Sequence, residues 1–330
     1  MKAILPKEPG GPDVLVMVEY PTPEPAGHEL LVRVKATALN RADLLQREGK
    51  YPPPKGESPV LGLEMAGEVE KVGSAVSGWR KGDRVCALLP GGGYAEYVTI
   101  PAKMAIPIPE NMSYENAAAI PEVFLTAFQA LYWLGGIKSS DNVLIHAGAS
   151  GVGTAAIQLV RGAGGVPFVT AGSAKKLDFC TQLGAKMAIN YKAGDFLPDI
   201  LEATENRGVD IILDFVGSPY WAQNIDALAT DGRLIILATM GGGKVDSLDL
   251  RKILVKRLRV IGTTLRARDL EYKQQLTNDF VRNILSGFEE GTYEPVVHEI
   301  LPWRQVKQAH RMMEDNQNIG KIVLQVGEES

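Results

Sequence analysis

The most informative part of this chain is Val143–Gly165, with the sequence VLIHAGASGVGTAAIQLVRGAGG. An apolar run leads into a glycine-rich turn, and the turn opens directly into a segment whose apolar residues recur at helical spacing. Strand, tight turn and helix in this order form the context in which a glycine loop holds a dinucleotide pyrophosphate. Gly151 and Gly153 let the backbone approach phosphate oxygens, and the free N–H groups at the helix start favour an anion.

The glycine pattern of this turn is imperfect. Aligned as Gly148-x-Ser150-x-x-Gly153, it carries Ser150 at the central glycine position. A glycine loop alone is equally compatible with an ordinary connection between a strand and a helix. The prediction of a nucleotide site therefore depends on a second signal further along the chain.

That second signal is the residue that would bind the ribose 2′-oxygen. In dinucleotide-binding folds an acid about 20 residues after the loop usually binds the 2′-hydroxyl of NAD. Here the next strand ends in Gly172-Ser173, followed by Lys175 and Lys176, and the acid is missing. Hydroxyls and cations suit the 2′-phosphate of NADPH, and Tyr191 at the end of the following strand adds a phenol. In the alternative interpretation, the lysines only solvate an exposed helix start.

Strands and helices alternate through the middle of the chain, which predicts an α/β fold with a parallel, doubly wound sheet. A long amphipathic helix is expected over 270–288. The expected strands are Val143–Ala147, Val166–Ala171, Ala188–Tyr191, Ile211–Val216, Leu234–Thr239 and Val260–Leu265; other expected helices are Asn116–Leu134, Ala174–Leu183 and Tyr220–Ala229.

The first 110 residues have a different pattern of predicted secondary structure. Short, partly alternating strands such as Leu31–Ala36, separated by Gly- and Pro-containing turns, indicate an antiparallel barrel or sandwich. Pro52-Pro53-Pro54 excludes a helix or a central strand there and places Tyr51 at the edge of a stiff loop. Residues 295–330 return to short strands.

Composition limits the classes of function. The 330 residues have a net charge of −4 and contain 2 Cys, and no long basic or apolar run is present. These features argue against a nucleic-acid surface and a membrane span. Cys86 and Cys180 lack metal-type spacing, so we expect reduced, buried thiols and a cytoplasmic location.

Several strings together resemble the quinone oxidoreductase branch of the medium-chain dehydrogenase/reductase superfamily. The strings are Ala38–Asp43, Gly62–Glu64, Gly82–Val85, Ala117–Pro121, His146–Gly153 and Asn318–Val323. The resemblance implies a GroES-like, β-rich catalytic domain over 1–120 and 290–330, with an NADPH-binding Rossmann domain over 121–289 between them. It further implies a cofactor cleft at their junction and a homodimer joined along the strand near 260–265.

The resemblance also implies site residues, position by position. Positions beside the nicotinamide and the substrate are Asn40, Tyr51 and Thr126. Ser150, Gly151 and Val152 match the pyrophosphate loop, and Gly172, Ser173, Lys176 and Tyr191 match the 2′-phosphate pocket. The rest of the cofactor is expected against Met240, Gly241, Thr264, Leu265, Asn318 and Lys321; Met240 and Leu265 are equally well read as core residues.

Zinc-dependent relatives differ from this chain where their metal is bound. They place a Cys where Asn40 stands and a His where Leu63 stands, and they carry a four-cysteine lobe that this chain lacks. Zinc needs three or four converging ligands, so we expect no metal. His146 is read as structural, and His28, His298 and His310 as surface residues without partners.

Without a metal to polarise a carbonyl, the substrate must accept hydride readily, as a quinone does. We therefore expect NADPH-dependent quinone reduction with the protein supplying orientation. One alternative is reduction of an activated C=C bond in an enone or a 2-enoyl thioester. A second is an NADPH-binding structural or RNA-binding protein, against which the acidic charge balance argues.

Overall fold

The computed structural model describes residues 1–327, and these form two compact units. The first unit contains residues 1–125 together with the C-terminal part of the chain from Leu265, and the second contains Thr126–Thr264. One unit is thus built from both chain ends, and the other is formed by the segment between them.

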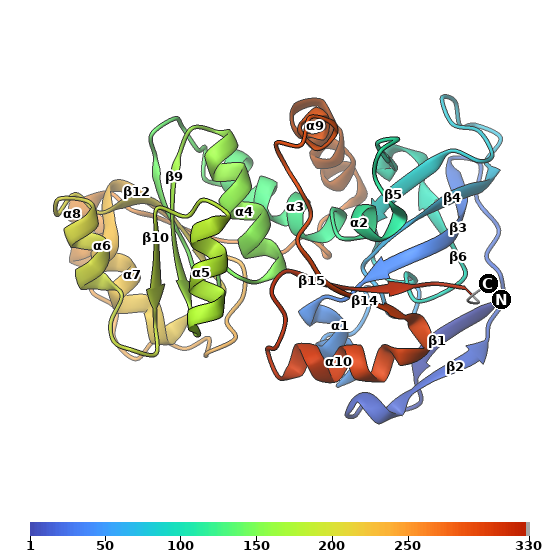
Figure 1. Cartoon of the computed structure of the whole chain (residues 1–330), viewed down its shortest axis with the longest axis horizontal. Helices are drawn as coiled ribbons and strands as arrows, with labels where there is room; N and C mark the ends of the chain where they lie inside the picture. Colours follow the sequence, from blue (N-terminus) through green and yellow to red (C-terminus); the bar gives the residue numbers. More distant parts are fainter. Residues whose placement is uncertain (328–330) are drawn as a thin grey trace. The chain divides into compact units, whose positions relative to one another are not determined.

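The second unit is built on a six-stranded parallel sheet (Figure 1). Its strand order is β10-β9-β8-β11-β12-β13, so consecutive strands run outward from β8 in both directions. The strands are β8 Asn142–Ile145, β9 Val166–Ala171, β10 Met187–Asn190, β11 Val209–Asp214, β12 Leu228–Ile236 and β13 Arg259–Gly262. All six overlap the strands expected from the sequence.

Helices connect these strands because each parallel pair needs a crossover. They are α4 Gly151–Gly162, α5 Ala174–Gln182, α6 Leu197–Ala203, α7 Trp221–Ala227 and α8 Leu250–Lys256, with a short 3₁₀ turn η4 at Ser218–Tyr220. Apolar residues from strands and helices pack into one core, including Leu144, Phe168 and Ile212. The carboxyl ends of the parallel strands lie at one edge of the sheet, where ligands bind in such folds.

The first unit contains a seven-stranded, mostly antiparallel sheet and a two-stranded one. The large sheet has the order β14-β15-β3-β4-β5-β7, and β6 pairs with β3. Its strands are β3 Glu29–Ala38, β4 Glu64–Val72, β5 Arg84–Leu88, β6 Tyr97–Pro101, β7 Ile106–Pro107, β14 Val297–Pro302 and β15 Lys321–Gln325; the small sheet pairs β1 Lys2–Pro6 with β2 Leu15–Glu19. Because β15 pairs with β3, the C-terminal segment completes the N-terminal sheet.

The helices of the first unit are few, as expected. They are α1 Arg41–Arg47, α2 Tyr114–Ala118, α9 Leu270–Glu289 and α10 Val306–Glu314, with 3₁₀ turns η1 Pro12–Val14, η2 Ala102–Met104 and η5 Trp303–Gln305. Helix α9 lies in this unit rather than in the nucleotide-binding domain to which the sequence assigned it. Its Thr277 hydroxyl contacts Met104, and its Phe288 ring packs on Phe124 at 4.9 Å.

The helix expected over 116–134 is divided into three parts. Helix α2 ends at Ala118, α3 spans Pro121–Phe128, and a π-helical segment, η3, spans Gln129–Leu134. The physical reason is Pro121, which has no N–H to donate and fits only the first turn of a helix. The apolar spacing of the segment was correctly recognised, but the break was missed.

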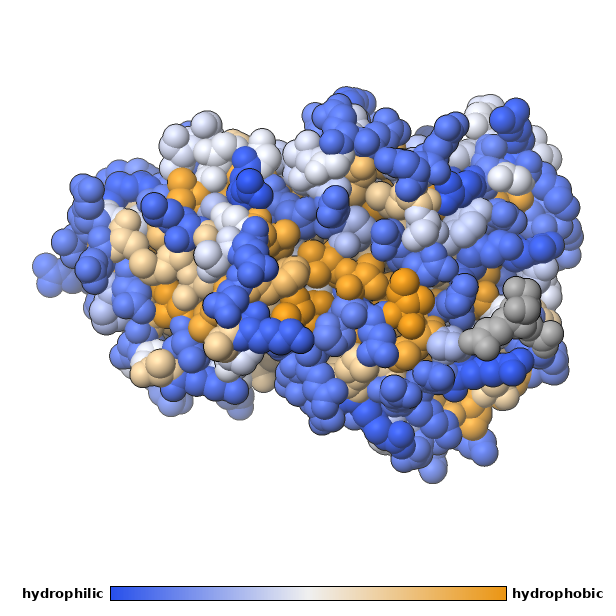
Figure 2. Space-filling view, viewed as in Figure 1, coloured by the Kyte–Doolittle hydropathy of each residue, from blue (hydrophilic) through white to orange (hydrophobic). Residues whose placement is uncertain are grey.

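No helix within residues 1–327 is long and apolar enough to cross a membrane. Hydrophilic side chains cover much of the visible surface of each unit (Figure 2).

Candidate functional site

The glycine-rich turn of the second unit joins β8 to α4. Ser150 caps the helix, because its hydroxyl accepts a hydrogen bond from Gly153 N at 3.1 Å. A side chain at Gly153 would meet the carbonyl oxygen of Ala147 at 2.4 Å, so only glycine fits there. Ala147 adopts a positive φ of 50° and turns the chain out of the strand. The turn therefore has the local geometry that the sequence predicted.

The end of β9 forms the second part of the expected nucleotide site. A side chain at Gly172 would meet the hydroxyl of Tyr191 at 2.7 Å, so the phenol lies directly against the Gly172 backbone. Ser173 begins α5 without capping it through its hydroxyl, and Lys176 lies in the first turn of the same helix. Tyr191 is 43% exposed. The phenol of Tyr191 thus lies against the end of β9, and the chain continues from there with Ser173 and Lys176 instead of the acid that would bind NAD.

His146 is structural, as predicted. Its ring is fully buried, with Nδ1 at 3.0 Å from Thr170 Oγ1 and Nε2 at 2.7 Å from Asn224 Oδ1. Asn224 donates its own amide to Asp214, which orients the amide oxygen toward the imidazole. Nε2 therefore carries the proton, and burial lowers the pKa of His146 to about 4. Cys86 and Cys180 are also buried, as expected.

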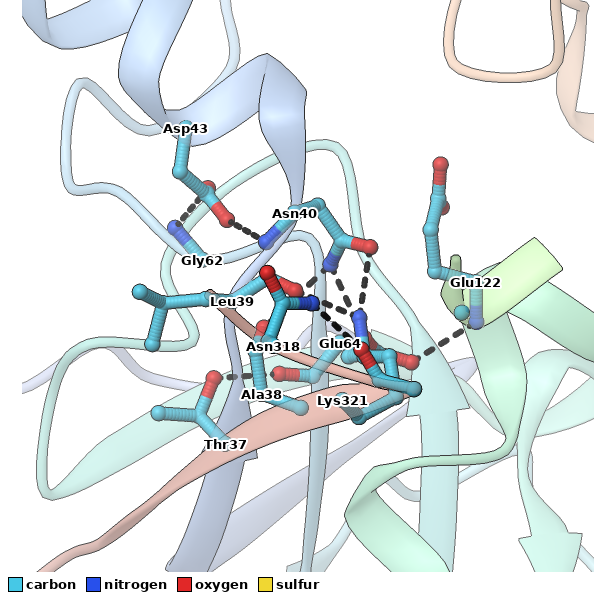
Figure 3. Close-up of polar contacts among 12 residues, drawn as sticks. Thr37, Ala38, Leu39, Asn40, Asp43, Gly62, Glu64, Glu122, Asn318 and Lys321 are labelled. Atoms are coloured by element: carbon cyan, nitrogen blue, oxygen red, sulfur yellow. Dashed lines mark hydrogen bonds and ion pairs between the residues drawn. The ribbon is translucent and has the colours of Figure 1, made fainter. Parts of the chain in front are cut away.

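In the first unit, three polar side chains from distant parts of the chain meet in the interior (Figure 3). Lys321 on β15 directs its Nζ at Glu64 Oε1, Asn40 Oδ1 and Leu39 O, at 2.7, 2.7 and 2.5 Å. Asn40 Nδ2 donates to Glu64 Oε1 at 2.8 Å and to Ala38 O at 3.2 Å. Glu64 is fully buried, and Lys321 is 3% exposed.

These contacts change the role expected of Lys321. An ammonium group has three N–H donors, and all three face protein oxygens, so none is left for a cofactor. Both donors of the Asn40 amide are committed as well, and only its oxygen can accept one further hydrogen bond. Lys321 therefore positions Asn40 and Glu64, and a contact of Lys321 with NADPH stays a prediction.

Two more carboxyl groups adjoin this cluster. Asp43 accepts hydrogen bonds from the backbone N–H groups of Asn40 and Gly62 at 2.8 and 3.0 Å. Burial raises the pKa of Asp43 to about 6. Glu122 donates its backbone N–H to Glu64 Oε2 at 2.8 Å, and its side chain points away from the cluster (Figure 3). Desolvation, followed by the charge of Glu64, raises the pKa of Glu122 to about 8.

Tyr51 lies under an arginine in the same unit. The guanidinium of Arg266 is 5.1 Å from the centre of the Tyr51 ring. Desolvation raises the pKa of Tyr51, while the charge of Arg266 lowers it. Neither Arg266 nor Glu122 was identified from the sequence as a candidate site residue. No local sequence pattern shows that an arginine is buried, or that the glutamate after Pro121 adjoins a polar cluster.

The remaining predicted residues divide between the units. Thr126 on α3, Gly151 and Val152 on α4, and Met240, Gly241 and Thr264 in strand-end loops belong to the second unit. Leu265 and Asn318 belong to the first. Leu265 is buried, which favours the core interpretation, whereas Met240 is 62% exposed. Asn318 donates its side-chain amide to Gly320 O at 2.7 Å. Contacts of these residues with a ligand stay predictions.

The prediction that His310 is a surface residue without partners was wrong. It is fully buried on α10, with Nδ1 at 3.1 Å from Arg47 Nη1 and Nε2 at 3.2 Å from the Tyr94 hydroxyl. Because an arginine only donates, Nδ1 accepts and Nε2 carries the proton. His298 was also wrongly described, since it accepts the Ile319 amide at 3.4 Å; His28 is exposed as expected.

Comparison with known proteins identifies the family. Residues 151–281 match the family described as zinc-binding dehydrogenase, and residues 26–110 match the alcohol dehydrogenase GroES-like domain. A quinone oxidoreductase of Rattus norvegicus is 30% identical over 327 residues, covering 98% of this chain and 97% of the relative. The chain belongs to the medium-chain dehydrogenase/reductase superfamily.

Solved structures of this superfamily include members with different activities. Escherichia coli quinone oxidoreductase complexed with NADPH superposes with a TM-score of 0.88 at 30% identity, covering 99% of this chain and 100% of that chain. The structure of an NAD-dependent alcohol dehydrogenase superposes with a TM-score of 0.87 at 34% identity, covering 99% of this chain and 100% of that chain. The structure of CurK enoyl reductase superposes with a TM-score of 0.85 at 29% identity, covering 99% of each chain. The fold prediction of a GroES-like domain plus a Rossmann domain is confirmed.

The zinc of some superfamily members does not fit the residues of this chain. Within the described part of the chain, no three His, Cys, Asp or Glu side chains group to hold a metal. Glu64 is already bound by Lys321, Asn40 and the Glu122 amide. Leu63 is buried and offers no ligand atom. Zinc analysis of active protein remains the direct test of the metal-free prediction.

Proposed function

We propose that the protein is an NADPH-dependent quinone oxidoreductase that works without a metal. The observation that carries the proposal is the end of β9, where Tyr191 lies against Gly172 and the chain continues with Ser173 and Lys176 instead of an acid. A cation with hydroxyl donors suits a phosphate, whereas NAD-binding members usually place an acid there. The relative crystallised with NADPH and the quinone oxidoreductase sequences support the same conclusion.

NADPH, when bound, supplies the hydride. The remaining work falls to side chains of the chain, which orient the acceptor and limit the access of water. Asn40 is held rigidly by Glu64 and Lys321, so its remaining acceptor site has a fixed direction. Tyr51 is proposed to lie against the acceptor as a flat aromatic contact. The hydroquinone anion is weakly basic and takes its last proton from water, so no acid needs to be placed beside it.

The test is a screen of quinones, enones and enoyl thioesters with NADPH and NADH, repeated with Tyr51→Phe. The substitution keeps the aromatic ring and removes at most one neutral hydrogen bond, so we expect less than about tenfold loss of quinone reduction. Wild-type protein should reduce quinones fastest and prefer NADPH. If enones or enoyl thioesters are the faster substrates and Tyr51→Phe abolishes their turnover, the quinone proposal is wrong.

The second candidate is reduction of an activated C=C bond, which the similarity to CurK enoyl reductase favours. Hydride addition to an enoyl thioester leaves a carbanion that must be protonated at carbon, and a placed acid contributes about 10²–10⁴-fold there. Tyr51 is the candidate acid. Its desolvation holds the proton on the phenol, as such a role requires.

Within the branch, the chain resembles the tumour-suppressor-induced quinone oxidoreductase, and we propose that it is related to that enzyme. The segments that carry the resemblance are Leu39–Asp43, Leu88–Gly93 and Arg266–Asp269.

We also propose a homodimer in the cytoplasm, joined along β13. That strand is at the sheet edge and pairs only with β12 within the described residues, and Leu254 and Val255 of α8 are 76% and 65% exposed. Sedimentation of Leu254→Glu as a monomer, with wild type as a dimer, would support this interface.

A further inference from the structure

Arg266 is an unusually placed cation in the first unit. Its side chain is 6% exposed. Nε donates to Pro90 O at 2.8 Å, and Nη2 donates to Gln46 Oε1 at 2.7 Å. The Tyr51 ring lies 5.1 Å from the guanidinium carbon. Two of the three nitrogens are therefore oriented by neutral acceptors, and an aromatic face adjoins the group.

The third nitrogen, Nη1, has no hydrogen-bond partner. Among the buried side-chain nitrogens and oxygens of residues 1–327, it is the one left without a partner. Buried donors in native proteins are almost always paired, and an unpaired one calls for an explanation such as an unfilled ligand position. Nη1 belongs to a permanently charged group, which makes its loss of water especially costly.

The charge of Arg266 is not neutralised by an ion pair in the described part of the chain. The acids within electrostatic range are Asp43, Glu122 and Glu57. Asp43 is committed to two backbone amides, and burial raises the pKa values of Asp43 and Glu122 to about 6 and about 8. Glu57 is exposed, and Lys273 on α9 adds a second positive charge. None of these acids is hydrogen-bonded to Nη1, so its N–H groups remain open to an oxygen acceptor.

We infer that Arg266 is an acceptor-binding residue whose Nη1–H binds the acceptor oxygen that becomes negatively charged in the reaction. The reaction itself rests on the proposed function. A quinone that receives a hydride, two electrons with one proton, becomes a hydroquinone monoanion, and water supplies the second proton. A donor placed in advance at the developing charge stabilises that anion more than the neutral quinone. The site thus takes carbonyl acceptors whose reduced form is an oxyanion.

The aromatic ring of Tyr51 stabilises the Arg266 guanidinium in the absence of an acceptor. A cation over an aromatic face is attracted to the ring, which partly replaces the missing partner. Nη1 is closed to water, so we expect the acceptor oxygen to reach it when a neighbouring side chain such as Tyr51 moves. The following residue is Pro52, which restricts the Tyr51 backbone to extended conformations. Movement of the ring is therefore expected at the side chain rather than in the backbone.

The experiment measures binding of 4-nitrophenolate, a non-reducible analogue of the hydroquinone monoanion, by its absorbance in titrations of the full-length protein. Variants are Arg266→Met and Arg266→Lys. The matched control is Arg233→Met, which removes a second buried arginine that is paired with Asp141 at 2.9 Å in the other unit. A hydrogen bond to a charged group corresponds to about tenfold or more in affinity.

We expect the dissociation constant for 4-nitrophenolate to rise at least about tenfold in Arg266→Met and less in Arg266→Lys. Arg233→Met should leave it unchanged while lowering stability. Equal weakening by both methionine variants, or no weakening by either, would overturn the inference. Failure of wild type to bind the phenolate would also overturn it. If Arg266→Met does not fold, Arg266→Lys decides, because it keeps the charge and loses the planar fork.

Turnover of a series of quinones separates this inference from the proposed function. In wild type, rates should depend weakly on the basicity of the hydroquinone anion formed, and in Arg266→Lys the dependence should steepen. An unchanged dependence would count against contact with the developing charge. If no quinone is reduced but phenolate binding still requires Arg266, the proposed function fails and the assignment of the anion-binding residue stands.

Discussion

The two polar regions of the molecule are built in opposite ways. The turn from Ala147 to Thr154 in the second unit uses backbone groups that are close in sequence, and it leaves helix N–H groups for a ligand. The cluster around Glu64 in the first unit joins side chains from β15, β4 and the end of β3, and its donors are used within the protein. One region is formed by chain conformation, and the other by packing of distant segments.

The two regions are therefore sensitive to different kinds of substitution. The turn depends on the absence of side chains at positions where backbone atoms nearly touch. The cluster depends on exact pairing of buried charges, because an unpaired buried charge is far more costly than a broken surface pair. Substitutions chosen for each region should therefore fail in different ways and by different amounts.

The largest effect is expected when Lys321 is removed. Lys321→Met leaves Glu64 buried without its cation and Asn40 without its donor, and loss of one partner of a buried pair costs about 3–5 kcal/mol. The free energy of unfolding from urea denaturation measures this. The control is Lys71→Met, which breaks an exposed pair with Glu24 at 3.0 Å and should cost less than about 1 kcal/mol. Similar losses in both variants would contradict the comparison.

Next in size is a side chain added to the turn. In Gly153→Ala the new methyl group would lie 2.4 Å from Ala147 O and 2.6 Å from Gly148 O. Backbone cannot yield easily there, so we expect about 1–3 kcal/mol of destabilisation and weaker nucleotide binding. Gly194→Ala adds the same methyl group where nothing lies within 4 Å, and it should change neither quantity. Normal NADPH affinity in Gly153→Ala would remove the turn from the cofactor site.

The buried histidines test both units by pH. His310 in the first unit and His146 in the second have pKa values lowered to about 3 and about 4, chiefly by desolvation. The unfolded chain binds a proton on each near pH 6.5, so the free energy of unfolding falls as the pH drops below that value. Each histidine should contribute about 1.6 kcal/mol of this loss between pH 6.5 and 5.

Substitution assigns that pH dependence to its source. His310→Gln and His146→Gln should each flatten the fall in unfolding free energy between pH 6.5 and 5. His28→Gln, at an exposed position, should leave the profile of wild type intact. A profile that stays equally steep in both buried variants would show that other groups dominate the acid sensitivity.

The smallest expected effect concerns the 2′-phosphate contact. Lys176→Ala should raise the Michaelis constant for NADPH by about tenfold, the scale of one charge-assisted contact, and leave that for NADH nearly unchanged. Lys175→Ala, the exposed neighbour, serves as the control. Equal effects of Lys176→Ala on both cofactors would mean that the lysine lies elsewhere.

The elements of the second unit were predictable because their signals are local. All six parallel strands overlap the predicted segments. Helix α9 of the first unit was predicted equally well, because it spans Leu270–Glu289 against an expected 270–288. The break at Pro121 was missed, since the apolar spacing continues through it. The place of α9 in the first unit was missed too, because its contacts with Met104 and Phe124 are made far along the chain.

The turn at Ser150 and the missing acid after Gly172 could be read from the sequence alone, because each depends on neighbouring residues and backbone preferences. The contacts of Lys321, His310 and Arg266 became visible only in the folded chain. Their partners are far away in the sequence. His310 contacts Arg47, 263 residues away, Lys321 contacts Asn40, 281 residues away, and Arg266 contacts Gln46, 220 residues away. A charged side chain reads as a surface residue in sequence, and burial with distant partners changes its chemistry.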